Sequence, residues 1–319
     1  MTNTPAPART FAALSILEKT APPLRYGRPP YWRAPIPGPA GRVYVPTWDW
    51  AKPLQPAAGT QLLDLDVNGA WLGAISSVEI AHNRLFHTGA LWFETKRDII
   101  PGLYRITNFP WGLHSSIVSP LGNSDLIEDA DTLWIAHPTL ILLWELMDEG
   151  IGIHFDVVDS WTARNPETDH VHRANFKKWY EQLKTYRTRF LDNVGHAHPG
   201  EPAPDRCDCP ACTDYAAFKT GYASAVSMML TGEKCRTNRE DWGRAIQAEF
   251  AASCWRKAWR YGSTGRTVLS MADVDELTVI AEEFNSGLNA ATKAFRYDQS
   301  GRSMGAFKVK RTYAHKPED

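Results

Sequence analysis

Residues 61–77 read QLLDLDVNGAWLGAISS, and the rest of the chain is organised around them. Its apolar residues predict a β-strand that carries two carboxylates, Asp64 and Asp66. Asn68 and Gly69 predict a turn after the strand, and the small residues that follow indicate a helix. A carboxylate at the end of a strand is a candidate ligand for a divalent cation.

A second acidic stretch lies far along the chain, at residues 267–280, TVLSMADVDELTVI. Two β-forming arms flank D-V-D, which predicts a hairpin with Asp273 and Asp275 at its tip. A strand-end aspartate and an acidic hairpin, brought together, can hold two divalent ions, as enzymes of phosphoryl transfer do. We therefore expect these two remote acidic turns to meet.

Size and composition describe a soluble globular chain with a substantial core, since 43% of its 319 residues are hydrophobic and 22% are charged. It shows no apolar run long enough for a membrane span and no signal-peptide layout, and its five cysteines suit a reducing interior. A cytoplasmic location is therefore expected. A net charge of −1 is an argument against a nucleic-acid binder, since such proteins are often basic overall. The argument is weak, because a basic channel can coexist with an acidic exterior.

Residues 1–57 are rich in Pro and Ala and predict an extended N-terminal arm, with a short helix over residues 11–19. Its arginines, Arg42 among them, are interleaved with aromatic residues, a mixture that suits contacts with the backbone and bases of a nucleic acid. A solvated arm with aromatic anchors explains this mixture equally well.

The next segment alternates between strand and helix patterns. We expect strands over residues 90–93, 102–107, 132–136 and 153–160, and a helix that starts at His137-Pro138 and stops at Gly150. This run predicts a sheet covered by helices, an α+β layer.

Long helical patterns follow over residues 174–192, 215–230 and 238–261, with a plausible N-cap at Asn238. A helix over 281–294 and a basic strand over 305–316 end the chain. In the first long helix Tyr180, Lys184 and Arg187 recur on one face, for which a solvated basic face is the alternative account. The second helix carries one central lysine, Lys219.

Residues 196–212, HAHPGEPAPDRCDCPAC, separate the first two long helices and contain a C-x-C-x2-C cluster. Cys207, Cys209 and Cys212, with His196 or His198, could complete a tetrahedral zinc site. The spacing is not the usual pair of C-x2-C motifs, so buried or incidental thiols stay an alternative.

These motifs, in this order over residues 39–319, resemble the palm and fingers of family B DNA polymerases, especially the protein-primed phage type. D-V-N-G-A-W at 66–71 is similar to the first palm motif, and A-D-V-D-E at 272–276 to the catalytic hairpin. F-K-K-W-Y at 176–180, with Arg187, and then Lys219 resemble the two fingers helices. R-T-Y at 311–313 is similar to the motif that holds the primer end, and P-A-G-R at 39–42 to a template-contact motif.

The resemblance implies an α+β fold, a polymerase palm whose antiparallel sheet is backed by helices, with a helical fingers insertion. It divides the chain into an N-terminal arm (1–57), a first part of the palm (58–173), fingers-like helices with the Cys-rich insert (174–234), and a second part of the palm with the hairpin and the basic strand (235–319).

The same resemblance implies roles for individual residues. Asp66 and Asp275, with the Val67 carbonyl, would bind two Mg2+ or Mn2+ ions, and Asp273 would be an auxiliary acid. Arg187 and Lys219 would clamp the dNTP triphosphate, Trp71 would exclude a ribose 2′-hydroxyl, and Tyr222 would be a platform for the nucleobase. The expected contacts with primer or DNA are Arg42, Lys308, Lys310, Arg311 and Tyr313.

The chain also departs from the family pattern. The motif at Lys219 lacks its Asn and Tyr-Gly, and the hairpin has Met271, Val274 and Glu276 where the family has Tyr, Thr and Ser. No exonuclease domain and no thumb are recognisable, so we expect no proofreading, and a partner that supplies the thumb function.

The expected function is a minimal template-directed DNA polymerase, primase-like, that extends a primer 3′-hydroxyl or a terminal-protein hydroxyl in a plasmid, phage-like or other mobile element. One alternative is a palm that has lost catalysis and serves as a DNA-binding or replication-initiation protein. Another is a different two-metal nuclease or nucleotidyltransferase.

Overall fold

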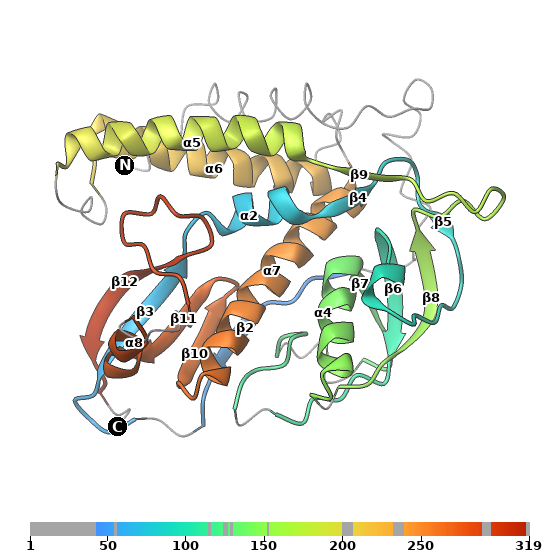
Figure 1. Ribbon diagram of the computed structural model, residues 1–319, viewed down its shortest axis with the longest axis horizontal. Helices are drawn as coiled ribbons and strands as arrows, with labels where there is room; N and C mark the ends of the chain where they lie inside the picture. Colours follow the sequence, from blue (N-terminus) through green and yellow to red (C-terminus); the bar gives the residue numbers. More distant parts are fainter. Residues whose placement is uncertain are drawn as a thin grey trace.

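The computed structural model describes residues 43–53, 56–113, 116–123, 127, 130–151, 153–199, 207–231, 239–288 and 295–316. The predicted helix at 11–19, Arg42 with its motif, and Asn238 lie outside these residues. The described chain forms two five-stranded sheets with helices packed against them (Figure 1). The expected α+β class is confirmed.

The first sheet has the strand order β12-β3-β11-β10-β2 and is antiparallel throughout. Its strands are β2 (Trp48–Ala51), β3 (Gln61–Val67), β10 (Val268–Asp273), β11 (Glu276–Ile280) and β12 (Phe307–Ala314). The predicted strand after residue 61, the acidic hairpin and the basic C-terminal strand are therefore confirmed, and the first two are hydrogen-bonded neighbours.

Alternation along β3 gives this sheet one apolar and one polar face. Leu63, Leu65 and Val67 are buried in the main core, as are Leu277 of β11 and Phe307 of β12. Because neighbouring residues of a strand point to opposite faces, the two aspartates of β3 lie on the other side of the sheet. The apolar pattern thus fixes which face carries the acids.

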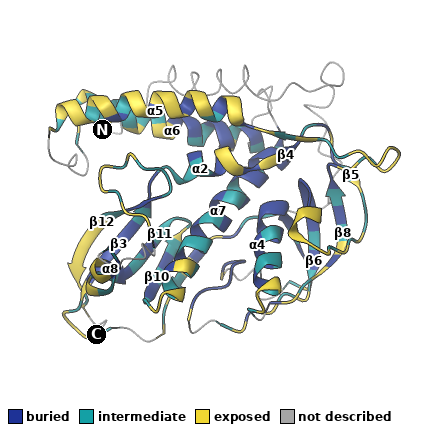
Figure 2. Ribbon diagram, viewed as in Figure 1, coloured by how far each residue is buried: buried dark blue, intermediate teal, exposed yellow. Residues whose placement is uncertain are grey.

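Helix α7 (Glu240–Ser263) is the centre of the molecule, and it contacts strands of both sheets, β10 in the first and β7 in the second. Helices α2 (Ala70–Ser77), α4 (His137–Asp148) and α6 (Pro210–Thr231) pack against it (Figure 1). Figure 2 shows α7 and β3 as largely buried. Trp255 of α7 is fully buried, and its Nε1 donates a hydrogen bond to the Val118 carbonyl at 3.0 Å.

The second sheet has the order β1-β7-β6-β8-β5 and is mixed, because β1 runs parallel to β7. Its strands are β1 (Val43–Tyr44), β5 (Phe86–His87), β6 (Gly102–Thr107), β7 (Leu133–Ala136) and β8 (Asp156–Thr162). A strand over 90–93 was wrong, since Leu91 forms only an isolated bridge to Val157. β1 and β2 come from the predicted arm, whose described residues therefore supply strands to both sheets.

Helices α5 (Lys177–Ala197) and α6 (Pro210–Thr231) lie side by side (Figure 1). Phe190 and Phe218 form a contact between them, with ring centroids 5.2 Å apart.

α5 starts later than predicted, because residues 173–175 form β9 (Arg173–Asn175), which pairs with β4 (Glu79–Ala81). Helix α8 (Ala281–Leu288) and the short helix η1 (Lys96–Asp98) complete the described elements. None of the described helices has the length and apolar character that a membrane crossing requires.

Candidate active site

Two acidic side chains that are far apart in the sequence meet at one end of the first sheet. Asp66 lies near the end of β3, and β11 pairs with β3 so that Glu276 is opposite Asp66. Asp275 precedes Glu276 in the hairpin turn, and its carboxyl group is in hydrogen-bond contact with that of Asp66. The two predicted acidic turns therefore converge.

Ionising both carboxyl groups in this position is unfavourable. Burial, and then the charge of Asp66, raises the pKa of Asp275 to about 7. Lys308 of β12 forms an ion pair with Asp66, with 2.8 Å between Nζ and Oδ2. A divalent cation shared by both carboxylates would relieve their repulsion, and carboxylate oxygens are ligands that Mg2+ prefers. The donor set therefore fits a divalent cation.

Asp273 and Val67 lie next to this pair in the chain. Asp273 ends β10, is exposed and has a φ of 52°, a left-handed conformation that Asp adopts more readily than most residues. Val67 ends β3, and because a valine side chain has no ligand atom, only its backbone carbonyl could bind a metal.

Asp64 is a buried anchor on the polar face of the sheet, two residues before Asp66 and 2% exposed. Its Oδ1 accepts hydrogen bonds from Thr278 Oγ1 at 2.8 Å and from the Tyr313 hydroxyl at 3.1 Å. Its Oδ2 pairs with Arg311 at 2.7 Å. This buried, hydrogen-bonded role of Asp64 was not predicted from the sequence. Its position two residues before Asp66 was a signal for it, because residues two apart in a strand lie on the same face.

The basic residues of β12 are paired with acids of their own sheet. Lys310 Nζ binds the Glu276 carboxylate closely, and this contact raises the pKa of Lys310. Arg311 reaches the same carboxylate at 3.0 Å. An open groove is lined by Asp64, Arg311, Thr312 and Tyr313. Four of the predicted primer contacts, Lys308, Lys310, Arg311 and Tyr313, thus share one strand, and each of the four already has a partner in the protein.

Arg187 is buried, at 5% exposure, between α5 and the loop of residues 298–305. Its Nη1 donates to the Arg302 carbonyl at 2.9 Å, and its Nη2 donates to the Gly301 carbonyl. A Cβ added to Gly69, which has a φ of 59°, would lie 3.5 Å from Arg187 Nε. The turn after β3 and Arg187 are therefore close neighbours.

Tyr180, Lys184 and Arg187 recur along α5 but differ in burial. Lys184 is exposed, with its Nζ 5.8 Å from the centroid of the Tyr180 ring. Arg187 instead continues the buried stripe of Leu183 and Leu191. The alternative of a solvated basic face is therefore wrong at Arg187, because contacts with the loop of residues 298–305 bury this side chain while Lys184 stays exposed.

The loop of residues 298–305, between α8 and β12, had no signal in the sequence. Asp298 organises it by accepting hydrogen bonds from Ser300 and Ser303. Burial acts to raise the pKa of Asp298, but these hydrogen bonds outweigh it and lower the pKa to about 2. The Asp298 carbonyl accepts a bond from Asn68 Nδ2 at 2.7 Å, so the loop is fixed to the turn after β3.

Lys219 of α6 interacts electrostatically with the acidic pair. Partial desolvation lowers the pKa of its ammonium group, and the charge of Lys308 adds to this effect, while Asp66 and Asp275 oppose it. The side chain keeps access to solvent. α6 therefore places a cation in the field of both acids, and Arg187 is a further neighbour in that field.

Two predicted nucleotide contacts are packed against protein. Tyr222 is 4% exposed and makes an edge contact with Phe218 at 5.3 Å between ring centroids, and burial raises its pKa. A buried ring offers no open face to a base, so this position does not support its expected platform role. Trp71 is half-buried and stacks on Phe250 of α7, with 4.6 Å between ring centroids.

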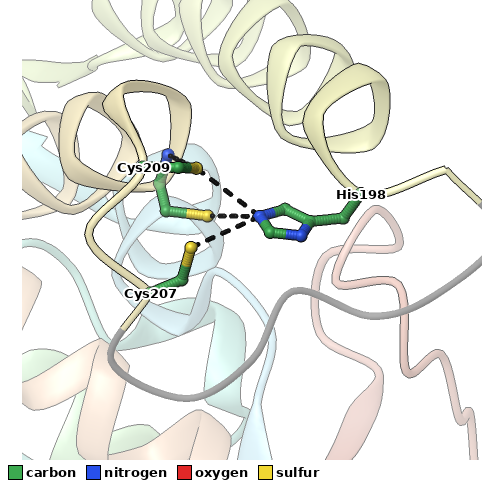
Figure 3. A group of neighbouring side chains, drawn as sticks. His198, Cys207 and Cys209 are labelled. Atoms are coloured by element: carbon green, nitrogen blue, oxygen red, sulfur yellow. Dashed lines mark hydrogen bonds between the residues drawn. The ribbon is translucent and has the colours of Figure 1, made fainter.

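A separate cluster joins the end of α5 to the start of α6. The Nε2 atom of His198 lies 3.4 Å from the Cys207 sulfur and 3.5 Å from that of Cys209 (Figure 3). It also lies 3.4 Å from the Cys212 sulfur. All four candidate ligand atoms lie within 4.8 Å of one another, so the cluster could bind a metal. Of the two histidines that the sequence left open, His198 is the one at the thiols, and His196 is exposed on α5.

The fold is similar to that of Phi29 DNA polymerase. The complex of that enzyme with primer-template DNA matches 96% of this chain at a TM-score of 0.56, and the complex with single-stranded DNA matches 85% at 0.54, both at 10% identity. The chain spans about half the length of these polymerases, 51% and 46% respectively. No protein-family pattern matches the sequence, and neither does the sequence of any curated protein. The chain thus has a DNA-polymerase-like fold.

Proposed function

We propose that this chain is a minimal DNA polymerase that transfers a nucleotide from a dNTP to a primer 3′-hydroxyl or to a protein hydroxyl, directed by a template. In this proposal the first sheet is the palm, and α5 and α6 are fingers. The replication of a plasmid, phage-like or other mobile element, with a primase-like start, belongs to the same proposal.

The observation that carries this function is the contact between Asp66 and Asp275, with which the Lys219 ammonium interacts electrostatically. A triphosphate needs positive charge along its length, and positioned cations stabilise the charge that develops on transfer. A hydrolase would instead need room at the acids for an attacking water. Cations next to the acids therefore favour nucleotidyl transfer over a nuclease.

The acids provide the metal ligands of the proposed reaction, together with the Val67 carbonyl. Bound Mg2+ or Mn2+ ions would supply activation of the hydroxyl and stabilisation of the departing pyrophosphate. In the transfer, the hydroxyl oxygen bonds to the α-phosphorus, the bond from that phosphorus to pyrophosphate breaks, and the hydroxyl proton leaves to water. Lys219 binds the triphosphate and reduces the repulsion between it and the acids.

Two contacts must change before the site can work in this way. Lys308 must leave Asp66 to free its Oδ2, and the negative phosphates of a primer offer Lys308 another partner. Arg187 must release the carbonyls of Gly301 and Arg302 before it can reach a triphosphate. Movement of the loop of residues 298–305 is therefore part of the proposal.

The test is incorporation of labelled dNTP on primed, unprimed and protein-primed templates with Mg2+ or Mn2+. Wild type should incorporate label, whereas Asp66→Ala and Asp275→Ala should lose at least about 100-fold, as removal of a group that stabilises the transition state does. Glu276→Gln, at the neighbouring carboxylate, is the matched control and should retain most activity. Equal activity in the wild type and both alanine variants would refute the proposal.

A second candidate is a polymerase-like DNA-binding or replication-initiation protein without catalysis. The observation in its favour is that Asp66 and Arg187 both already have protein partners, Lys308 and the loop carbonyls. This candidate predicts that wild type binds primer-template DNA with an affinity that Asp66→Ala does not lower, and incorporates no label with either metal.

A further inference from the structure

The cluster of His198, Cys207, Cys209 and Cys212 lies outside the acidic site and is built from two helix ends. His198 follows the last residue of α5, where its backbone N–H still donates to the Val194 carbonyl. Cys209 immediately precedes α6, and Cys212 lies in its first turn. Cys207 comes from the short segment before them. One group at this point would therefore join both helices.

The donor set selects the kind of ligand. Three thiolates and one imidazole nitrogen are a set that tetrahedral zinc sites use, and all four side chains are only partly buried, so the metal can enter. The Cys209 sulfur accepts a hydrogen bond from the backbone N–H of Cys212 at 3.5 Å, which stabilises a thiolate at the start of a helix. The cysteines form no disulfide with one another, and each remains a free thiol.

The position of the cluster along both helices has a geometric consequence. With a rise of about 1.5 Å per residue, Arg187 lies roughly 16 Å before His198 on α5, and Lys219 lies roughly 15 Å after Cys209 on α6. Two adjacent helices that are joined at this end must therefore hold these two residues at nearly the same level. Arg187 and Lys219 do interact electrostatically, as expected for residues at the same level along two adjacent helices.

We propose that His198, Cys207, Cys209 and Cys212 bind one structural Zn2+ that fixes the register of α5 against α6. The ion holds the two helix ends together, and the contact between Phe190 and Phe218 continues the pairing towards Arg187 and Lys219. Metal binding itself is independent of the polymerase activity. The effect of the register on nucleotide binding rests on the proposed function.

Metal content tests the ligand set. The full chain, purified without chelator, should contain about one zinc per molecule, and His198→Gln and Cys209→Ser should retain less than about a tenth of it. His196→Gln is the matched control, since His196 lies two residues away on α5 and should change nothing. Equal loss in the two histidine variants, or wild type without zinc after loading and dialysis, would overturn the site.

Cobalt substitution covers the case in which the variants do not fold. Wild-type chain loaded with Co2+ should show the intense visible bands of a tetrahedral site together with thiolate-to-cobalt charge transfer. The weak visible spectrum of an octahedral, oxygen-ligated ion, without the charge-transfer band, would also overturn the site.

Amide hydrogen exchange tests the register. Removal of zinc should speed exchange in the end of α5 and the beginning of α6 and leave α7 protected. If nucleotide addition is observed, the zinc-free chain should also show a KM for dNTP raised several-fold with a smaller change in kcat. Unchanged exchange in both helices on zinc removal would contradict the register, whatever the polymerase assay shows.

Discussion

Asp66, at the end of β3, and Asp275, in the β10–β11 turn, are in direct carboxyl–carboxyl contact, and Lys308 pairs with Asp66. The sheet creates this contact, because β11 lies between β10 and β3 and places the hairpin turn at the end of β3. Main-chain pairing holds the two acids together, and in the proposed function they are a preorganised cation site. The repulsion between the two carboxylates lowers the stability of the folded protein as long as no cation is bound.

The pKa of Asp275 predicts how the stability of the metal-free protein depends on pH. Its folded value of about 7 lies above the value of about 3.9 for an unfolded Asp. The folded chain therefore holds a proton that the unfolded chain lacks between about pH 4 and 7, and the stability that this proton contributes is lost as pH rises through 7. Asp275→Asn removes the titration. In chelator its Tm should exceed that of wild type at pH 8, with a smaller difference at pH 5.

Lys308 should compete with divalent cations for Asp66. Lys308→Gln removes the ammonium group at 2.8 Å from Oδ2, so the affinity for Mn2+ in calorimetry should rise several-fold. Lys310→Gln is the matched control, because Lys310 pairs with Glu276 instead. A lower Mn2+ affinity in Lys308→Gln than in Lys310→Gln would contradict this competition.

The contacts of Arg187 should make a large contribution to stability. Arg187→Ala removes two charge-assisted hydrogen bonds to loop carbonyls, and we expect a loss of about 2–4 kcal/mol in the free energy of unfolding. Denaturant titration measures this loss, and exposed Arg189→Ala on the same helix is the control. Equal stability of the two variants would show that the loop of residues 298–305 is not held by Arg187.

The two hydrogen bonds to Asp64 should separate stability from primer binding. Thr278→Val and Tyr313→Phe each remove one bond to Oδ1, and each should cost about 1 kcal/mol of stability. Tyr313 lines the open groove and Thr278 does not. The KM for primer should therefore rise in Tyr313→Phe and stay unchanged in Thr278→Val. The same KM for primer in both variants would remove Tyr313 from the primer site.

Trp71 is predicted to exclude the ribose 2′-hydroxyl. Its stacking on Phe250 fixes the orientation of the indole, so Trp71→Ala should raise the ratio of rNTP to dNTP incorporation. Phe250→Leu should raise this ratio less, because it loosens the indole without removing it. An unchanged ratio in Trp71→Ala would refute this role.

Local patterns in the sequence were sufficient to predict β3, the acidic hairpin and the central helices. Alternation of Leu63 and Leu65 with the two aspartates identifies β3 without any tertiary information. The small residues after Gly69 indicate α2 in the same way. Features that depend on one segment and its neighbours were therefore predictable.

Features that depend on distant segments were not predictable. The burial of Arg187 arises from loop carbonyls more than a hundred positions away. The role of Asp64 requires β12 to pair with β3, and a bulge next to Lys310 brings Arg311 opposite Asp64. The choice of His198 over His196 depends on where α5 ends, and helix ends are the least certain part of a sequence-based prediction.

The most direct test of the shared cation site is diffraction from crystals of the full chain soaked in Mn2+. Anomalous scattering should reveal manganese between the carboxylates of Asp66 and Asp275, with Lys308 displaced from Asp66, and the peak should vanish in Asp275→Asn. Wild-type crystals with no manganese at these two acids, and with Lys308 still paired to Asp66, would contradict the account.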